Sequence, residues 1–126
     1  MHWLTIRRWN KRYRLIHFSS RMDISELTDE MHRFVRDKGW YDPSSPRPQT
    51  LRNLAISLNL EASEVLEHFQ WADRLEDSEA LADELADVAL YLLQIASVAE
   101  IDLEKAILSK LDRNYGRTWD SNQVEG

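Results

Sequence analysis

Apolar residues recur at helical spacing in four segments of the chain, which cover about residues 23–38, 50–71, 77–100 and 102–114. A short polar side chain that can cap a helix stands at the start of each segment. The connections between the segments are short, which favours antiparallel neighbours. The pattern therefore predicts an all-α fold, a small four-helix bundle.

The longest predicted connection is the loop of residues 40–49, which contains three prolines. Proline cannot continue a helix, so this stretch should be a stiff loop between the first two helices. Gly39 directly before it is a good helix stop. Because loops often carry function, this one is a candidate to line a binding site.

Four carboxylates stand out in the second and third segments: Glu61 and Glu64, then Glu84 and Asp87. Each pair is three residues apart on a predicted helix, so each pair faces one way. A helical projection of the apolar residues places Glu61 at the rim of the buried face of its helix and Glu64 beyond the rim. A single pair of this kind is typical of a solvated helix face.

The two pairs together indicate a metal site, because the short turn makes the two helices antiparallel neighbours with both pairs at similar heights. Four converging carboxylates repel one another, and a hard divalent cation removes that repulsion. Oxygen ligands favour Mg²⁺ or Mn²⁺ over iron or zinc. A di-iron site is the rival interpretation, but Asp29-x-x-His32 only approximates its Glu-x-x-His motif and occurs once.

Composition narrows the function classes. There is no cysteine, which excludes disulfides and thiolate metal sites and suits a reducing cytoplasm. No apolar run approaches the ~20 residues of a membrane span. Six Lys and Arg and no acid fall in residues 1–21, which leaves a body with 10 basic and 22 acidic residues. That acidic body argues against nucleic acid as the main partner.

The acids belong to a wider set of motifs. In chain order these are Leu51-Arg52-Asn53-Leu54-Ala55, Glu61-x-x-Glu64, His68-Phe69-Gln70-Trp71 and Glu84-x-x-Asp87. Together they resemble the signature of MazG-like nucleoside triphosphate pyrophosphohydrolases, in particular the dCTP-pyrophosphatase-like branch. The resemblance divides the chain into a basic N-terminal extension (1–22), a MazG-like helical domain (23–119) and a polar tail (120–126).

The resemblance implies an enzyme that hydrolyses a (deoxy)nucleoside triphosphate to the monophosphate and pyrophosphate, with dCTP or a modified pyrimidine nucleotide as first candidate. It implies Mg²⁺, or Mn²⁺ in its place, with Glu61, Glu64, Glu84 and Asp87 as ligands. Glu64 is the preferred candidate to activate the attacking water. The family works as a dimer or dimer of dimers, and small residues along the third helix independently favour a homodimer or homotetramer.

The resemblance also implies substrate contacts. Trp40 and Trp71 match aromatic residues at the base, and stacking on a flat base suits both. Tyr91 continues the face of Glu84 and Asp87. The remaining candidates are basic or amide side chains for the phosphates: Lys38, Lys110 and Asn114.

Two departures from the family bear on the choice of base. Where some relatives place a histidine near the base, this chain has Met31, with His32 one residue later and about 100° away around the helix. The loop between Trp40 and Asn53 also looks longer than in relatives. Two alternatives stay open: a phosphoribosyl-ATP pyrophosphohydrolase, and a non-enzymatic helical dimer that binds a partner through its basic arm.

Overall fold

The computed structural model describes residues 21–117, which form helices and connecting loops with no strand in that range. The helices are α1 (Ile24–Asp37), α2 (Leu51–Glu67), α3 (Ser78–Val98) and α4 (Leu103–Tyr115). This confirms the all-α prediction. The expected tail (120–126) and all but residues 21 and 22 of the expected extension lie outside the described residues.

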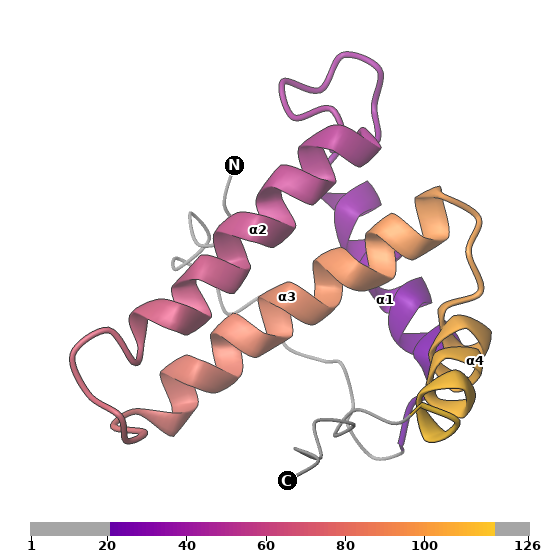
Figure 1. Ribbon diagram of the computed structural model, residues 1–126. Helices are drawn as coiled ribbons and strands as arrows, with labels where there is room; N and C mark the ends of the chain where they lie inside the picture. The colour runs from indigo at the N-terminus through magenta and orange to yellow at the C-terminus, as the bar shows by residue number, and fades with distance from the viewer. Residues whose placement is uncertain (1–20, 118–126) are drawn as a thin grey trace, which may run out of the picture.

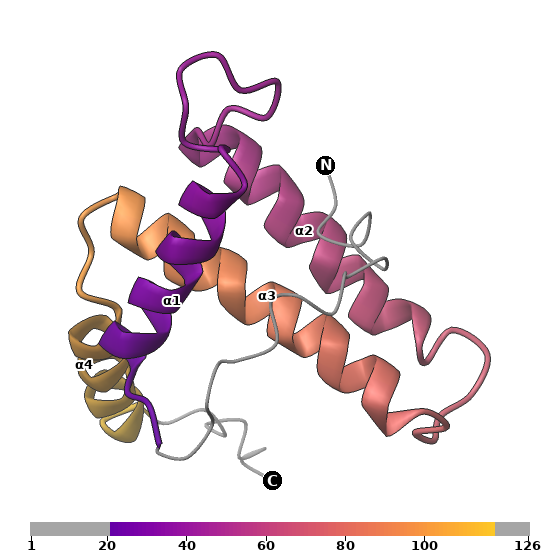
Figure 2. The same cartoon turned by 180° about the vertical axis from the view of Figure 1, so that it is seen from behind.

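Helix α3 is the centre of the fold (Figure 1). α2 runs antiparallel beside it, and α1 crosses α3 on the other side, as the reverse view shows (Figure 2). After α3 the chain turns back, and α4 lies beside the N-terminal end of α1 (Figures 1 and 2). The C-terminal half of α2 and the N-terminal half of α3 therefore extend as a helix pair past α1 and α4. Within the described range, no helix is both long enough and apolar enough to cross a membrane.

Each helix begins at a residue whose side chain accepts a hydrogen bond from a backbone N–H three positions on: Asp23, Thr50, Asp77 and Asp102. At α1 the bond is reciprocal, because the Glu26 carboxylate also accepts from the Asp23 backbone N–H. α1 is followed by Gly39, whose φ of 70° is the left-handed conformation that glycine adopts at little cost.

The C-terminal end of α2 differs from the prediction. The helix ends at Glu67, four residues before the expected end at residue 71. The backbone N–H groups of Phe69 and Gln70 bond to carbonyls three residues back, so the chain tightens into turns there. The apolar pattern continues past this point without a glycine or proline, so it gave no signal for the end.

The hydrophobic core is small and lies where α1 crosses the α2–α3 pair. Its buried members are Met31, Val35, Leu54 and Tyr91. Phe34, Trp40 and Tyr41 cover this cluster from the end of α1 and the loop behind it. The core therefore anchors the start of the loop of residues 40–49 to the helix pair.

The buried face of α2 overlaps only in part with its apolar stripe. Its buried residues are Leu54, Ser57 and Glu61, whereas Leu51 and Leu66 of the predicted apolar stripe are exposed. The prediction that Glu61 lies at the rim is therefore wrong, since its side chain is 0% exposed. The reason is tertiary: α3 packs against the face of α2 that carries the glutamate.

The core position of Leu54, which is 2% exposed, gives a stability prediction. Leu54→Ala should lower the free energy of unfolding by about 2–5 kcal/mol, because the cavity it leaves lies among α1, α2 and α3. The control Leu75→Ala, at a 49% exposed leucine, should change it by less than about 0.5 kcal/mol. Urea denaturation followed by circular dichroism measures both. Equal losses would contradict the assignment of the core.

Candidate active site

Three carboxylates converge between α2 and α3. One oxygen each of Glu61, Glu84 and Asp87 lies within 4.8 Å of the other two. Glu61 is 0% and Glu84 8% exposed, and Asp87 is half-buried. Such a group of acids at the boundary of a helix pair is not a solvated helix face.

The helix geometry explains why these acids meet. Glu84 and Asp87 are three residues apart on α3, so both point to the face that packs on α2. Glu61 lies on the face of α2 that carries Leu54 and Ser57, which packs on α3. Because the two helices are antiparallel and close to their connecting turn, the three side chains reach the same level.

The electrostatics of the cluster favour a cation. Carboxylates this close repel one another strongly where water is excluded. The nearest basic group recorded for Glu84 is His68, whose Nε2 lies 3.8 Å from Glu84 Oε1. Glu84 Oε2 is buried and has no hydrogen-bond partner among the described residues. A divalent cation bound by these oxygens would offset the repulsion, and the donor set suits Mg²⁺, Mn²⁺ or Ca²⁺ chemistry.

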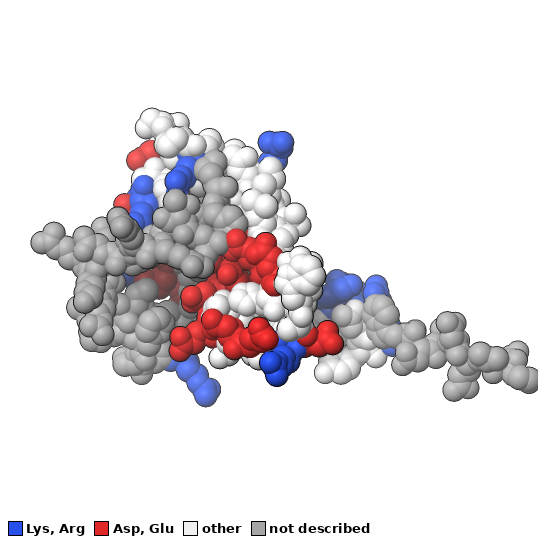
Figure 3. All heavy atoms as spheres, turned by 90° about the vertical axis from the view of Figure 1, so that its left-hand side faces the viewer, with Lys and Arg blue, Asp and Glu red and all other residues white. Residues whose placement is uncertain are grey.

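Glu64, the fourth predicted ligand, is not one of the three acids that converge. It lies less than one turn beyond Glu61 on α2 and is half-buried. The structure thus brings together three of the four predicted carboxylates and leaves the fourth at their edge. Acidic side chains also gather on the surface at the α2–α3 turn (Figure 3).

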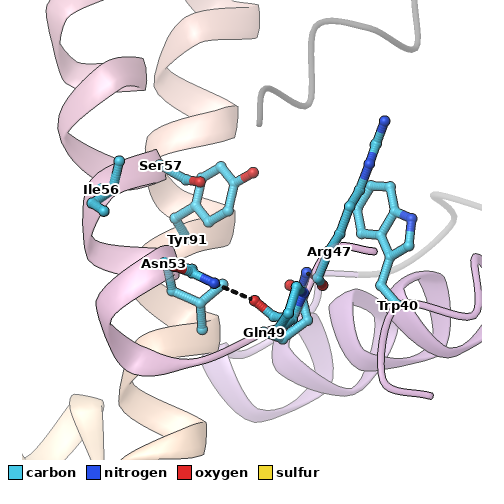
Figure 4. A pocket seen from close by; sticks show the side chains of 9 residues that line it. Trp40, Arg47, Gln49, Asn53, Ile56, Ser57 and Tyr91 are labelled. Atoms are coloured by element: carbon cyan, nitrogen blue, oxygen red, sulfur yellow. Dashed lines mark hydrogen bonds between the residues drawn. The ribbon is translucent and has the colours of Figure 1, made fainter. Parts of the chain in front are cut away.

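A pocket of about 210 Å³ lies next to the acids. Figure 4 shows Trp40 and Arg47 on one side, Ser57 and Tyr91 on the other, and Gln49 between them. The Arg47 guanidinium lies 5.5 Å from the centroid of the Trp40 ring, a cation–π distance. The pocket thus offers aromatic surface together with amide, hydroxyl and guanidinium groups, as a small-molecule site does.

The pocket and the acids are consecutive along the helix pair. Ser57 precedes Glu61 by four residues on α2, and Tyr91 follows Asp87 by four on α3. One helical turn, about 6 Å of rise, therefore separates the pocket wall from the carboxylates on both helices. A ligand with a flat ring at one end and a charged chain at the other could occupy both.

His32 and Met31 do not reach this pocket. Met31 is 2% exposed in the core. His32 Nδ1 lies 2.6 Å from the Tyr41 hydroxyl and Nε2 lies 2.7 Å from Ser97 Oγ. Burial and the nearby Arg36 lower the pKa of His32, against an opposing effect of Asp29, so the ring is neutral at pH 7. Burial likewise raises the pKa of Tyr41.

The other predicted substrate residues are spread over the chain. Trp71 is 91% exposed in the turn after α2 and is not part of the pocket. The Lys38 ammonium lies 5.7 Å from the Phe34 ring centroid. Lys110 is exposed and Asn114 half-buried on α4, away from the acids (Figure 1). Of the predicted substrate residues, a single chain brings only Trp40 and Tyr91 together.

The sequence interpretation missed several pocket residues. Ser57 had a signal, because it precedes Glu61 by one helical turn on the same face. For Arg47 and Gln49 there was no signal in the sequence beyond their place in the proline-containing loop, because a loop has no periodic pattern. Gln94, which is 0% exposed on α3 and bonds to Gln49, was also missed.

Comparison with known families now adds to this geometry. Residues 56–124 match the model of the MazG-like family. The chain belongs to the MazG-like family. The matched range includes all four predicted carboxylates, so the family assignment and the acid cluster concern the same part of the chain.

Individual relatives agree with this assignment. Rat dCTP pyrophosphatase 1 is 30% identical over 109 residues, covering 79% of this chain and 61% of the rat protein. The human protein of the same name is 31% identical over the same length. The chain therefore spans about three fifths of these relatives. The structure of a pyrophosphatase from Archaeoglobus fulgidus superposes with a TM-score of 0.60 at 31% identity, covering 75% of this chain and 91% of that one.

The acid cluster predicts that a divalent cation stabilises the fold. With Mg²⁺ roughly a hundredfold above its dissociation constant, the free energy of unfolding should rise by about 2.7 kcal/mol. Glu61→Gln should lose most of this gain, because one ligand and one charge are removed. Thermal denaturation with and without Mg²⁺ measures the difference. The exposed neighbour on α3 provides the control, as Asp83→Asn should keep the full gain. Equal gains in both variants would contradict a cation site at Glu61.

Proposed function

We propose that the chain is a Mg²⁺-dependent pyrophosphohydrolase that cleaves a (deoxy)nucleoside triphosphate to the monophosphate and pyrophosphate. The observation that carries the proposal is the buried cluster of Glu61, Glu84 and Asp87 one helical turn from an aromatic pocket. Carboxylates that hold Mg²⁺ typically do so together with substrate phosphates. The names of the rat and human relatives favour dCTP, or a modified pyrimidine dNTP, as the substrate.

Each group then has a role. Glu61, Glu84 and Asp87 hold the cation, with Glu64 at their edge as the fourth ligand. A cation bound there would neutralise phosphate charge and lower the pKa of a coordinated water. Glu64 orients the attacking water or accepts its proton, in keeping with its half-buried position. Trp40 and Tyr91 hold the nucleoside end in the pocket.

We further propose that the protein works as a homodimer or a dimer of dimers. The outer faces of the helix pair expose large apolar side chains, including Ile56, Leu66, Leu85 and Leu92. Such surface is typical of an interface between subunits. A second copy would also supply residues that do not line the pocket of a single chain: Trp71, Lys38, Lys110 and Asn114.

The biological role that fits this activity is clearance of surplus or non-standard nucleotides in the cytoplasm. The acidic body argues against nucleic acid as the main partner, because it and the phosphate backbone repel each other. A pocket of about 210 Å³ lined by Trp40 and Tyr91 supports a single base, and hence a free nucleotide, as the ligand.

Activity on a panel of nucleotides tests the proposed reaction. With Mg²⁺, the chain should release pyrophosphate and a monophosphate from at least one dNTP, as separated by ion-exchange chromatography. Glu61→Gln and Asp87→Asn should each lower kcat/KM by on the order of 100-fold or more, because each removes charge that holds the cation. Asp83→Asn is the matched control and should keep its activity. Release of orthophosphate, or no turnover of any nucleotide, would contradict the proposal.

Light scattering coupled to size exclusion tests the oligomer. The wild type should elute as a dimer or tetramer at micromolar concentration. Leu66→Asp, at a side chain 70% exposed in one chain, should shift the equilibrium toward monomer by placing a charge in the apolar interface. The control Leu75→Asp lies in the turn after α2 and should leave the assembly intact. A wild type that is monomeric throughout this range would contradict the proposed assembly.

A further inference from the structure

A chain of polar contacts runs from α1 through α3 into the wall of the pocket. Its first members are Ser97 and His32, and His32 Nδ1 lies 2.6 Å from the Tyr41 hydroxyl. The Gln94 amide nitrogen bonds to that hydroxyl at 3.3 Å and to Gln49 Oε1 at 2.8 Å. Gln94 is 0% exposed, so this bond network crosses the protein interior. It links the loop residue Gln49 to two helices.

The orientation of the Gln49 amide is set by its neighbours. Its Nε2 donates to the Arg47 backbone carbonyl at 2.8 Å, and a carbonyl can only accept. Gln49 Oε1 must therefore face Gln94, which must present its N–H₂ group in return. Turning the Gln49 amide over would place oxygen against the Arg47 carbonyl and N–H against N–H at Gln94. The amide is fixed in one sense.

The far end of the chain agrees with this direction. The Tyr41 hydroxyl accepts from Gln94, so its own proton is available to His32 Nδ1. His32 then carries its proton on Nε2 and donates to Ser97 Oγ. In this arrangement each contact along the path pairs one donor with one acceptor. The reversed arrangement fails at the Arg47 carbonyl.

We propose that Gln49 is the residue that selects the base in the pocket, and that Gln94 is a positioning residue that holds the Gln49 amide in its selective orientation. The inference rests on the proposed nucleotide pyrophosphohydrolase activity and names how that site chooses its substrate. Gln49 lines the pocket between Arg47 and Asn53 (Figure 4). Its Nε2 and its Oε1 each use one hydrogen bond within the protein, and each keeps one hydrogen-bonding position for a ligand.

The chemistry distinguishes cytosine from uracil. Cytosine presents an amino donor at C4 and an acceptor at N3, whereas uracil presents an acceptor at C4 and a donor at N3. A glutamine that can turn over pairs with either edge. A glutamine whose amide is held in one orientation pairs with only one of these edges. Against the other edge, its donor would face a donor and its acceptor would face an acceptor. The fixed amide therefore selects one of the two edges, and the names of the rat and human relatives favour cytosine as the base that it accepts.

The test compares dCTP with dUTP, which differ only at this edge. The wild type should favour dCTP by about 10- to 100-fold in kcat/KM, the discrimination typical of a bidentate amide contact. Gln49→Met removes the amide, and Gln94→Leu leaves it free to turn over. Both should lower this ratio about tenfold or more through KM, with kcat for dCTP retained, because neither residue touches the reacting phosphates.

The control is Thr28→Val, which removes one hydroxyl bonded within α1 and should keep the wild-type ratio. A wild-type ratio near one, an unchanged ratio in either glutamine variant, or equal loss of kcat for both nucleotides would overturn the inference. If Gln94→Leu does not fold, Gln49→Met decides alone, since Gln49 is half-buried in a loop. A wild type that hydrolyses no nucleotide contradicts the proposed function itself, whereas an active wild type with unchanged ratios contradicts only the selection by Gln49.

Discussion

The packing of α2 against α3 through a partly polar face is the constraint on which the rest of the structure depends. That face places Glu61 and Glu84 among buried groups, where an apolar residue would stabilise the fold more. The hydrophobic core is consequently displaced to one end of the pair, where α1 crosses. The hydrophobic core and the acid cluster thus lie at different positions along the same two helices.

The sequence predicted the helices well because each start has a capping side chain and each long segment a clear period. It misjudged how far the buried face of α2 extends toward Glu61. Leu51 and Leu66 belong to the larger apolar stripe, and a projection of one helix selects the larger stripe as the core. Within a single chain the covered face is the one that carries Leu54, Ser57 and Glu61. The pattern of a single helix does not show which of its faces packs against α3 and which packs elsewhere or stays exposed.

The residues of the candidate site could be predicted where they lie on helices with a clear periodic pattern. Glu61, Glu84 and Asp87 could be found because helical spacing brings them together from a short distance in sequence. Arg47 and Gln49 could not, because their place depends on how a loop folds back over α2. Gln94 gave no signal because an isolated glutamine in a helix is most often solvated, and only the packing of Tyr41 and Gln49 on α3 makes it a buried partner.

The two halves of the site therefore rest on different kinds of structure. The carboxylates come from two helices whose spacing is rigid, so their geometry follows from the helix pair alone. The base side of the pocket comes in part from the loop of residues 40–49, which is bonded to the helix pair through Gln49 and Gln94. Substitutions in that loop can change which ring is bound while Glu61, Glu84 and Asp87 keep their positions. On this arrangement, the choice of base can vary within the fold without disturbing the groups that act on the phosphates.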